Sequence, residues 1–272
     1  MIAPVDEEDM MGDSEEGSTG RRRLDGGDVR FRPGDVLMLE CPPTETTVAS
    51  VSRLYVSVRW PWNDVDPEAH SFRWNGETAL PTPEAFDWDS TYFRTVPAET
   101  DLKAGDTCLV GIAPTVVHVA SVHHFDPPLL TGMLPRPACY LEILRQGEAH
   151  DPELEDQGYA LDPVGGEPIR IELLFRPYAF LEAGDEIVDH DGRAWRFDGP
   201  WDWHSFDGRQ PTVPAWPLRL LSRNGDMTPD GTAGVARQTE TGSHEEELRR
   251  WTRLALARPS TDQLRPIDLR SG

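Results

Sequence analysis

The sequence predicts a mainly β protein made of small tandem barrel units, with a disordered acidic N-terminus and one amphipathic helix near the C-terminus. Glycine and proline together make up 48 of the 272 residues, which favours many turns between short elements. Apolar residues form 38% of the chain and include nine Trp, enough for a sizeable core. A Gly-Asp pair precedes an apolar run three times, at residues 34–35, 105–106 and 184–185. These observations together indicate repeated short strands.

Residues 1–27 are predicted to be disordered, because they are polar, glycine-rich and acidic and cannot offset the entropy of ordering. They lack the basic and apolar regions of a secretory signal, and the chain has no apolar run long enough to span a membrane. Cys41, Cys108 and Cys139 are widely spaced without a CxxC pair, so buried, reduced thiols are expected. We therefore expect a cytoplasmic protein.

Residues 28–147 are predicted to form a β domain of two barrel-like units. In each, an apolar run follows the Gly-Asp pair, and an alternating strand comes next. The strands of the first unit are expected at 36–39 and 54–58, and those of the second at 108–112 and 116–122. The last of these is rich in β-branched residues, as a half-buried strand should be.

An acidic linker is predicted over residues 148–168, because this segment contains proline and a Gly-Gly pair. The third β unit is expected over 169–224. Within it, Asp191-Gly192 favours a tight hairpin, since glycine adopts a positive φ without steric cost. Its closing segment, 214–221, parallels residues 137–144 of the second unit. Units of this size, opened by Gly-Asp and made of short strands, resemble SH3-like small barrels.

The C-terminal region is predicted to be a flexible tether over 225–242, a helix over 243–258 and a tail over 259–272. Ser243 and Glu246 have the spacing of a capping box, and Leu248, Trp251 and Ala255 form an apolar stripe. We expect the helix to dock on the protein's own surface, or else to anchor a partner or a second copy.

The charge is strongly negative, at −22. Residues 1–27 hold eight acids and three arginines, which leaves them at −5, while residues 222–272 hold eight of each and are neutral. The remaining −17 lies in residues 28–221. Such a body repels nucleic acid and anionic membranes, and it attracts a basic protein or peptide.

Arginine supplies 25 of the 26 basic residues, a usage typical of GC-rich genomes. Together with the phrases Trp-Pro-Trp at 60–62 and Phe-Arg-Pro-Tyr at 175–178, the chain resembles acidic actinobacterial proteins of unknown function. That resemblance implies no activity.

Two aromatic-acidic elbows are the candidate binding sites, because carboxylates beside aromatic rings bind cations through ion pairs and cation–π contacts. Their residues are Trp60, Trp62 and Asp64, with Asp66 close by, and Trp201, Asp202 and Trp203. An elbow that recurs with the repeat suits binding or structure better than catalysis.

Rival chemistry rests on fewer residues. Asp198, Asp202 and Asp207 could serve hydrolysis as paired carboxylates. His123, His124 and Asp126 are weak metal-ligand candidates. On a regular strand, His118 shares a face with His124 but lies about 20 Å from it. Asp189-His190-Asp191 is interpreted as a turn. The chain contains no P-loop, GxGxxG, GxSxG or HExxH motif, and no cofactor is expected.

We therefore interpret the sequence as a non-enzymatic interaction module, of the immunity-protein or antitoxin kind or an adaptor, whose acidic, Trp-bearing surface binds a basic protein or peptide. A hydrolase with a carboxylate or metal site is one alternative. A nucleic-acid mimic that blocks a DNA-binding protein is the other. The oligomeric state stays open.

Overall fold

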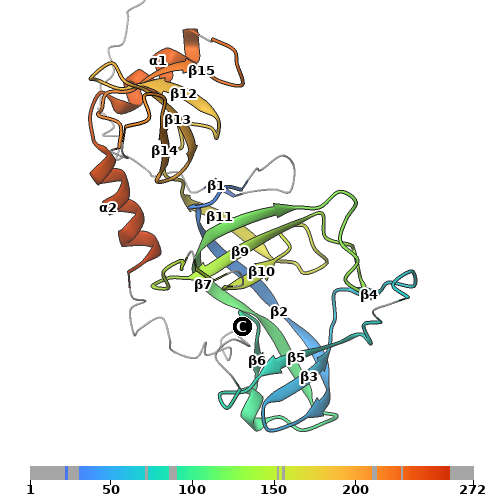
Figure 1. The fold of residues 1–272 in the computed structure, drawn as a ribbon. Coiled ribbons are helices and arrows are strands. Elements are labelled where there is room, and N and C mark those ends of the chain that lie inside the picture. Colours follow the sequence, from blue (N-terminus) through green and yellow to red (C-terminus); the bar gives the residue numbers. More distant parts are fainter. Residues whose placement is uncertain are drawn as a thin grey trace, which may run out of the picture.

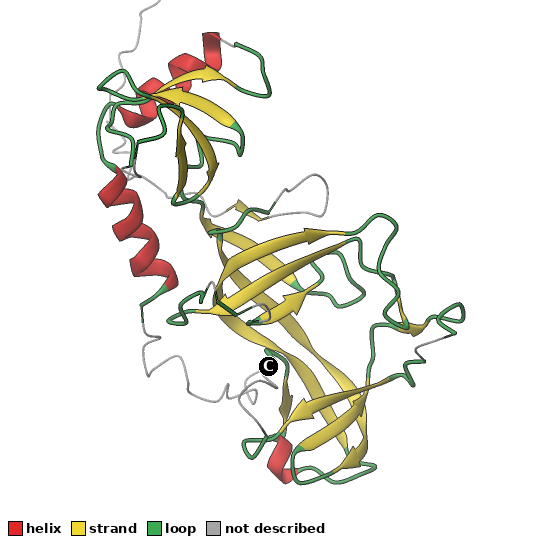
Figure 2. Cartoon of the chain, viewed as in Figure 1, coloured by secondary structure: helices red, strands yellow, loops and turns green. Residues whose placement is uncertain are grey.

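The computed structural model describes residues 22–23, 31–70, 73–85, 91–151, 153–154, 157–209, 213–227 and 229–257. The predicted mainly β character is confirmed, since 41% of the chain is strand and the described part contains two α-helices. Figures 1 and 2 show a large curled sheet, a smaller sheet beside one end of it, and a helix that runs alongside both. The predicted tails, apart from residues 22–23, lie outside the described residues.

The large sheet has nine strands, and its main order is β1-β11-β2-β7-β9-β10. In addition β3 pairs with β2 and β5, and β6 pairs with β7. A separate two-stranded sheet joins β4 to β8. The bounds are β1 Arg22–Arg23, β2 Val36–Val51, β3 Tyr55–Arg59, β4 Asp64–Val65, β5 Glu77–Pro81, β6 Arg94–Val96, β7 Thr107–His124, β8 Met133–Leu134, β9 Cys139–Arg145, β10 Tyr159–Leu161 and β11 Arg170–Phe175.

Two long strands connect what the sequence predicts as separate units. β2 and β7 contain 16 and 18 residues and pair along most of their length. Pro42 and Pro43 interrupt the apolar pattern of β2, but register shifts at Leu39/Cys41 and Cys41/Thr44 accommodate them as bulges. Separate barrels over residues 28–147 are therefore not confirmed, because both predicted units contribute to one sheet.

The small unit is a four-stranded antiparallel sheet in the order β14-β13-β12-β15. Its strands are β12 Asp185–Val188, β13 Ala194–Gly199, β14 Asp202–Ser205 and β15 Arg219–Ser222. The predicted hairpin between β12 and β13 is confirmed, and Gly192 takes a φ of 81° there. The predicted third unit is nevertheless divided, since β11 joins the large sheet.

Helix α1, Pro229–Thr239, occupies the segment predicted to be a flexible tether. Its sequence contains Gly231 and Gly234, which disfavour a helix in isolation. Val235 and Thr239 are buried against β15, and the Thr239 hydroxyl accepts a hydrogen bond of 2.8 Å from the Leu218 N–H. Tertiary packing therefore stabilises this helix where local propensity does not.

Helix α2, His244–Ala255, begins after Ser243, whose hydroxyl accepts the Glu246 N–H at 3.2 Å. The helix lies across both units (Figure 1). Near its start, His244 contacts Tyr178 of the small unit. Near its end, Trp251 donates its indole N–H to the Gly34 carbonyl at 2.9 Å, and Ala255 packs with Val36. Arg258, at the predicted helix end, lies outside the described residues.

The three Gly-Asp pairs form the same turn. Gly34, Gly105 and Gly184 have φ values of 85°, 90° and 89°. In each turn the aspartate side chain accepts the backbone N–H three residues earlier, and its own N–H returns to that residue's carbonyl. The sequence repeat is therefore a repeated strand-opening turn.

Two of these turn aspartates are buried and hold an arginine. Arg176 donates two hydrogen bonds of 2.7 Å to the Asp35 carboxylate, and Arg223 donates one of 2.6 Å to the Asp185 carboxylate. Asp35 opens β2, whereas Arg176 follows β11, so their pair ties the large sheet to the start of the small unit.

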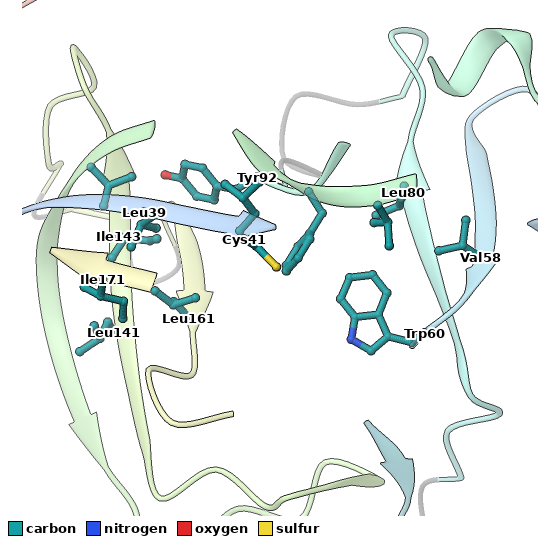
Figure 3. Close-up of a cluster of buried hydrophobic side chains, with 14 of the residues drawn as sticks. Leu39, Cys41, Val58, Trp60, Leu80, Tyr92, Leu141, Ile143, Leu161 and Ile171 are labelled. Atoms are coloured by element: carbon teal, nitrogen blue, oxygen red, sulfur yellow. The ribbon is translucent and has the colours of Figure 1, made fainter. Parts of the chain in front are cut away.

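The main core lies inside the curl of the large sheet (Figure 3). Leu39, Leu141 and Ile143 are fully buried at one end, while Val58, Leu80 and Trp60 pack at the other. The small unit has its own core, built around Tyr178, Trp195 and Leu218. Cys41 and Cys108 are buried and all three cysteines are free, as predicted.

Candidate functional site

The first aromatic elbow follows β3 and closes one end of the main core. Trp60 is only 9% exposed, and its ring meets Trp62 and Phe93 edge-on at 4.9 and 4.8 Å. Its indole N–H donates to Glu167 Oε1 at 3.0 Å. The carboxylate of Glu167, which lies in the predicted linker and far from Trp60 in the sequence, therefore holds the elbow in place.

A pocket of about 110 Å³ lies between this elbow, β10 and residues 162–169. We call it the acidic pocket. Its polar lining comes from Asn63, Thr131, Tyr140, Tyr159, Asp162 and Glu167, and its apolar lining includes Phe93 and Met133. No lysine, arginine or histidine is among the lining residues. The pocket therefore combines two carboxylates with three aromatic rings.

The two carboxylates of the acidic pocket each accept one hydrogen bond, Asp162 from the Val164 N–H and Glu167 from the Trp60 indole. Burial raises the pKa of Asp162, and the charge of Glu167 raises it further, while the Val164 N–H lowers it. Asn63 Oδ1 is buried and has no hydrogen-bond partner among the described residues. A cation with several N–H groups would satisfy the carboxylates and this oxygen together.

Local sequence explains how the loop reaches the elbow. The Asp162 carboxylate accepts the Val164 N–H at 2.9 Å, which turns the chain directly after β10. A Cβ added at Gly166 would lie 2.6 Å from the Trp62 carbonyl oxygen. Only glycine therefore lets the loop approach the elbow backbone this closely.

The aspartates after the first elbow have different surroundings. Asp64 is exposed on β4. Asp66 is buried, and its hydrogen bonds with Arg136, at 2.7 and 3.1 Å, lower its pKa. Asp66 therefore stabilises the loop, whereas Asp64 is open to a partner.

The second elbow lies in the small unit. Trp203 is buried, and Trp201, which has a φ of 71°, packs against Tyr178 at 5.4 Å and Trp251 of α2 at 5.8 Å. Asp202 is exposed at the start of β14. The two elbows belong to different cores, so the six predicted residues do not gather into one site.

Two of the three carboxylates named for hydrolysis, Asp198 and Asp207, are paired with arginines. Asp198 receives two hydrogen bonds from Arg196, at 2.7 and 2.9 Å. Asp207 is held by Arg193, and that contact lowers its pKa to about 2. His204 Nδ1 lies 3.7 Å from Asp198 and 4.0 Å from Asp202, on an edge strand.

The histidines of β7 do not lie as predicted. A register shift between Val119 and Ser121 reverses the alternation, so Val122 packs against the same core as Val117 and Val119. His118 and His124 therefore face opposite sides. His123 is near Ser121 Oγ, at 2.6 Å, and Glu142, at 3.2 Å, while Asp126 is exposed. Among the residues described, no three His, Cys, Asp or Glu side chains group to hold a metal ion.

The Asp189-His190-Asp191 segment is a turn, as interpreted from the sequence. Asp189 is buried, and its carboxylate accepts the Arg193 N–H at 2.8 Å and the Trp195 indole N–H at 2.9 Å. His190 and Asp191 are exposed.

No protein-family model, curated protein or solved structure matches this chain. In the part of the chain that the structure describes, no helix is both long and apolar enough to cross a membrane.

Sequence reasoning identified Trp60 and Trp62, which do not line the acidic pocket, and it missed the two carboxylates that do. Asp162 and Glu167 lie about a hundred residues away, in a segment predicted to be linker. Its one strand signal, Tyr159–Leu161, forms β10. Three residues are too few for an alternation pattern to reveal.

Proposed function

We propose that the protein is a non-enzymatic interaction module that binds a basic protein or peptide, and that a cationic side chain of this partner enters the acidic pocket. The observation that carries the proposal is the pairing of Asp162 and Glu167 with aromatic walls in a pocket that has no basic lining residue. An immunity-type neutraliser and an adaptor both fit this description.

The pocket suits a lysine or arginine head group. Its volume of about 110 Å³ matches a small polar group, not a large ligand. Carboxylates would attract the charge, the lining rings of Tyr140 and Tyr159 are of the type that forms cation–π contacts, and Asn63 Oδ1 would accept one further hydrogen bond. Around the pocket, the −17 carried by residues 28–221 would steer a basic partner toward it.

Binding of tetra-arginine and tetra-lysine peptides, followed by calorimetry, tests the proposal. The double variant Asp162→Asn/Glu167→Gln keeps the side-chain shapes and removes both charges. We expect it to weaken binding of the preferred peptide at least about tenfold, the effect of losing one charge-assisted hydrogen bond. Asp191→Asn, at an exposed aspartate of the small unit outside both elbows, is the matched control and should bind as wild type does.

Salt distinguishes pocket binding from the attraction of a diffuse acidic surface. The pocket variant and the wild type are compared at low salt and at about five times that concentration, because exposed charges are screened more strongly than enclosed ones. If only the wild type still binds the peptide at high salt, the result supports binding in the acidic pocket. Equal binding by both proteins would contradict it and would favour a nucleic-acid mimic, whose affinity depends on total charge.

A further inference from the structure

A second, larger pocket has the opposite charge. It encloses about 310 Å³ on the outer side of the large sheet, where β2, β6, β7 and the end of β9 meet. Met38 and Val116 pair in register across β2 and β7 and line its floor. Their neighbours Leu37 and Val117 belong to the main core, so the floor faces away from that core. Arg94 and Arg145 also line the pocket, which we call the arginine pocket.

The two arginines converge on one carbonyl. Arg94 Nη1 donates to the Thr91 carbonyl at 3.0 Å, and Arg145 Nη2 donates to the same oxygen at 2.8 Å. The Arg145 guanidinium also lies 4.9 Å from the centre of the Tyr92 ring. These contacts hold both positive groups at one place without neutralising either.

Three other arginines of the described residues have different partners. Arg136, Arg176 and Arg223 each grip a buried aspartate. Within the described ranges, no carboxylate forms an ion pair with Arg94 or Arg145. Glu148 lines the pocket, and its Oε2 accepts the Arg145 backbone N–H at 2.9 Å. The two side-chain cations of this pocket therefore lie together without a bound carboxylate, in a chain with 48 acidic residues.

The electrostatics of the pair favour the binding of an anion. Partial burial lowers the pKa of Arg94, and the positive charge of Arg145 lowers it further, while Glu99 raises it. Two guanidinium groups that disfavour each other's charge would both be stabilised by a negative group placed between them.

We propose that the arginine pocket binds a small organic carboxylate with an apolar body. The carboxylate would lie against the guanidinium groups of Arg94 and Arg145, where planar N–H groups suit its two oxygens. The apolar body would cover Met38, Ala113 and Val116. A volume of about 310 Å³ is at the lower end of small-molecule sites, and an apolar wall under a charged rim is typical of them.

This site is independent of the acidic pocket. Tyr92 of the arginine pocket contacts Tyr159 of the acidic pocket edge-on, with ring centres 5.4 Å apart, so the aromatic pair forms a wall between them. The two pockets have opposite charges and share no lining residue. Neither proposal therefore depends on the other.

Titration of the full chain with benzoate, followed by amide chemical shifts, tests the proposal. We expect saturable shifts at Ala113, Thr115, Val116 and residues 145–148, with a dissociation constant in the millimolar range or tighter. Acetate carries the charge without the apolar body, benzyl alcohol carries the ring without the charge, and inorganic phosphate is a small anion without an apolar part. Each should bind at least about tenfold more weakly than benzoate.

Two variants distinguish the site from a general effect. Arg145→Gln should weaken benzoate binding at least about tenfold. Ala113→Leu keeps both arginines and fills the pocket, so it should also abolish the saturable shifts if Arg145→Gln proves unstable. Arg219→Gln, on exposed Arg219 of β15, is the control. The proposal is overturned if benzoate shifts are absent, if phosphate binds as tightly as benzoate, or if Ala113→Leu leaves binding unchanged.

Discussion

At the scale of single residues, His118 is a buried titratable group without a hydrogen-bond partner. It is 1% exposed, and neither ring nitrogen is bonded within the described structure. Its ring packs edge-on against Trp251 at 5.5 Å. Burial, and to a smaller degree the charge of His150, lowers the pKa of His118 from 6.5 to about 4. The contact between β7 and α2 therefore requires a neutral imidazole.

This shift predicts a loss of stability in mild acid. Above pH 6.5 the imidazole is neutral in both states, so His118 costs no stability there. Between pH 6.5 and about 4 the unfolded chain takes up a proton that the folded chain does not, so the free energy of unfolding falls as the pH falls. The shift corresponds to about 3 kcal/mol at most. Urea unfolding at several pH values between these limits measures it.

The variant His118→Phe keeps an aromatic ring against Trp251 and removes the titration. Its unfolding free energy should depend less steeply on pH than that of the wild type over the same interval. Equal slopes in the two proteins would show that other groups govern the acid sensitivity, since acidic side chains also titrate as the pH falls.

Asp35 is a second residue whose buried carboxylate we expect to contribute strongly to stability. It is fully buried, accepts the Arg32 N–H at 3.0 Å and receives two hydrogen bonds from Arg176. Asp35→Asn would remove the buried carboxylate that accepts two hydrogen bonds from Arg176. We expect a loss of about 3 kcal/mol, measured by thermal or urea unfolding.

Asp106 provides the control for that substitution. It occupies the same position of the same turn and accepts the Lys103 N–H at 2.8 Å, but it is exposed. Asp106→Asn should cost less than about 1 kcal/mol. Similar losses for Asp35→Asn and Asp106→Asn would mean that the turn itself, and not the buried ion pair, provides the stability.

At this scale the sequence predicts residue types better than their surroundings. The Gly-Asp pairs were visible because a positive φ and a turn aspartate have a strong local signature. The burial of Trp60 was not visible, because its partner Glu167 comes from a loop more than a hundred residues away. Whether a tryptophan lies in a core or at a surface depends on such distant contacts.

At the scale of elements, the two helices show what local sequence can reveal. α2 has a strong start signal, because Ser243 caps it. Trp251 and Ala255 of its predicted apolar stripe are packed, whereas Leu248 is exposed. α1 has no such start signal, since its stability comes from burying Val235 and Thr239. The sequence predicted only residues 36–39 of β2, and it predicted β7 as two strands at 108–112 and 116–122, because prolines and bulges interrupt the alternation.

α2 acts as a clamp between the two units, and Trp251 is its main contact. Trp251→Ala removes the ring that packs on Trp201 and His118 and the hydrogen bond to Gly34. We expect a loss of about 2–4 kcal/mol. Arg249→Ala, on the exposed side of the same helix, should change stability by less than about 0.5 kcal/mol.

Hydrogen exchange measures the clamp directly. In Trp251→Ala, protection should fall first in α2 and β14, while the core of β2 and β7 keeps its slow exchange, because the large sheet has its own hydrophobic core. Uniform loss of protection in both units would show that they unfold as one cooperative body and that α2 is not a separate clamp.

At the scale of the whole molecule, composition predicted the fold class but not the pairing of distant strands. Composition predicted a mainly β chain, because many glycines and prolines leave room only for short elements. It did not predict that strands from distant segments would join one sheet, because β11 pairs with β2 across more than a hundred residues. Local patterns contain no information about such pairing.

The net charge of −22 does permit a prediction for the whole molecule. Exposed carboxylates repel one another across the surface, and compaction brings them closer than they are in the unfolded chain. The buried pairs Asp35–Arg176, Asp66–Arg136 and Asp185–Arg223 act against this repulsion, but salt screens buried charges much less than exposed ones. Added NaCl should therefore weaken the repulsion more than the attraction, and calorimetry should show the Tm rising between about 10 and 150 mM NaCl, where the Debye length shortens from about 30 to 8 Å. Near the pI of about 4.6 the same salt should have little effect, because the net charge is then small.

A Tm that falls with NaCl at neutral pH would mean that exposed ion pairs such as Arg53–Glu84 and Arg170–Glu40 outweigh the repulsion.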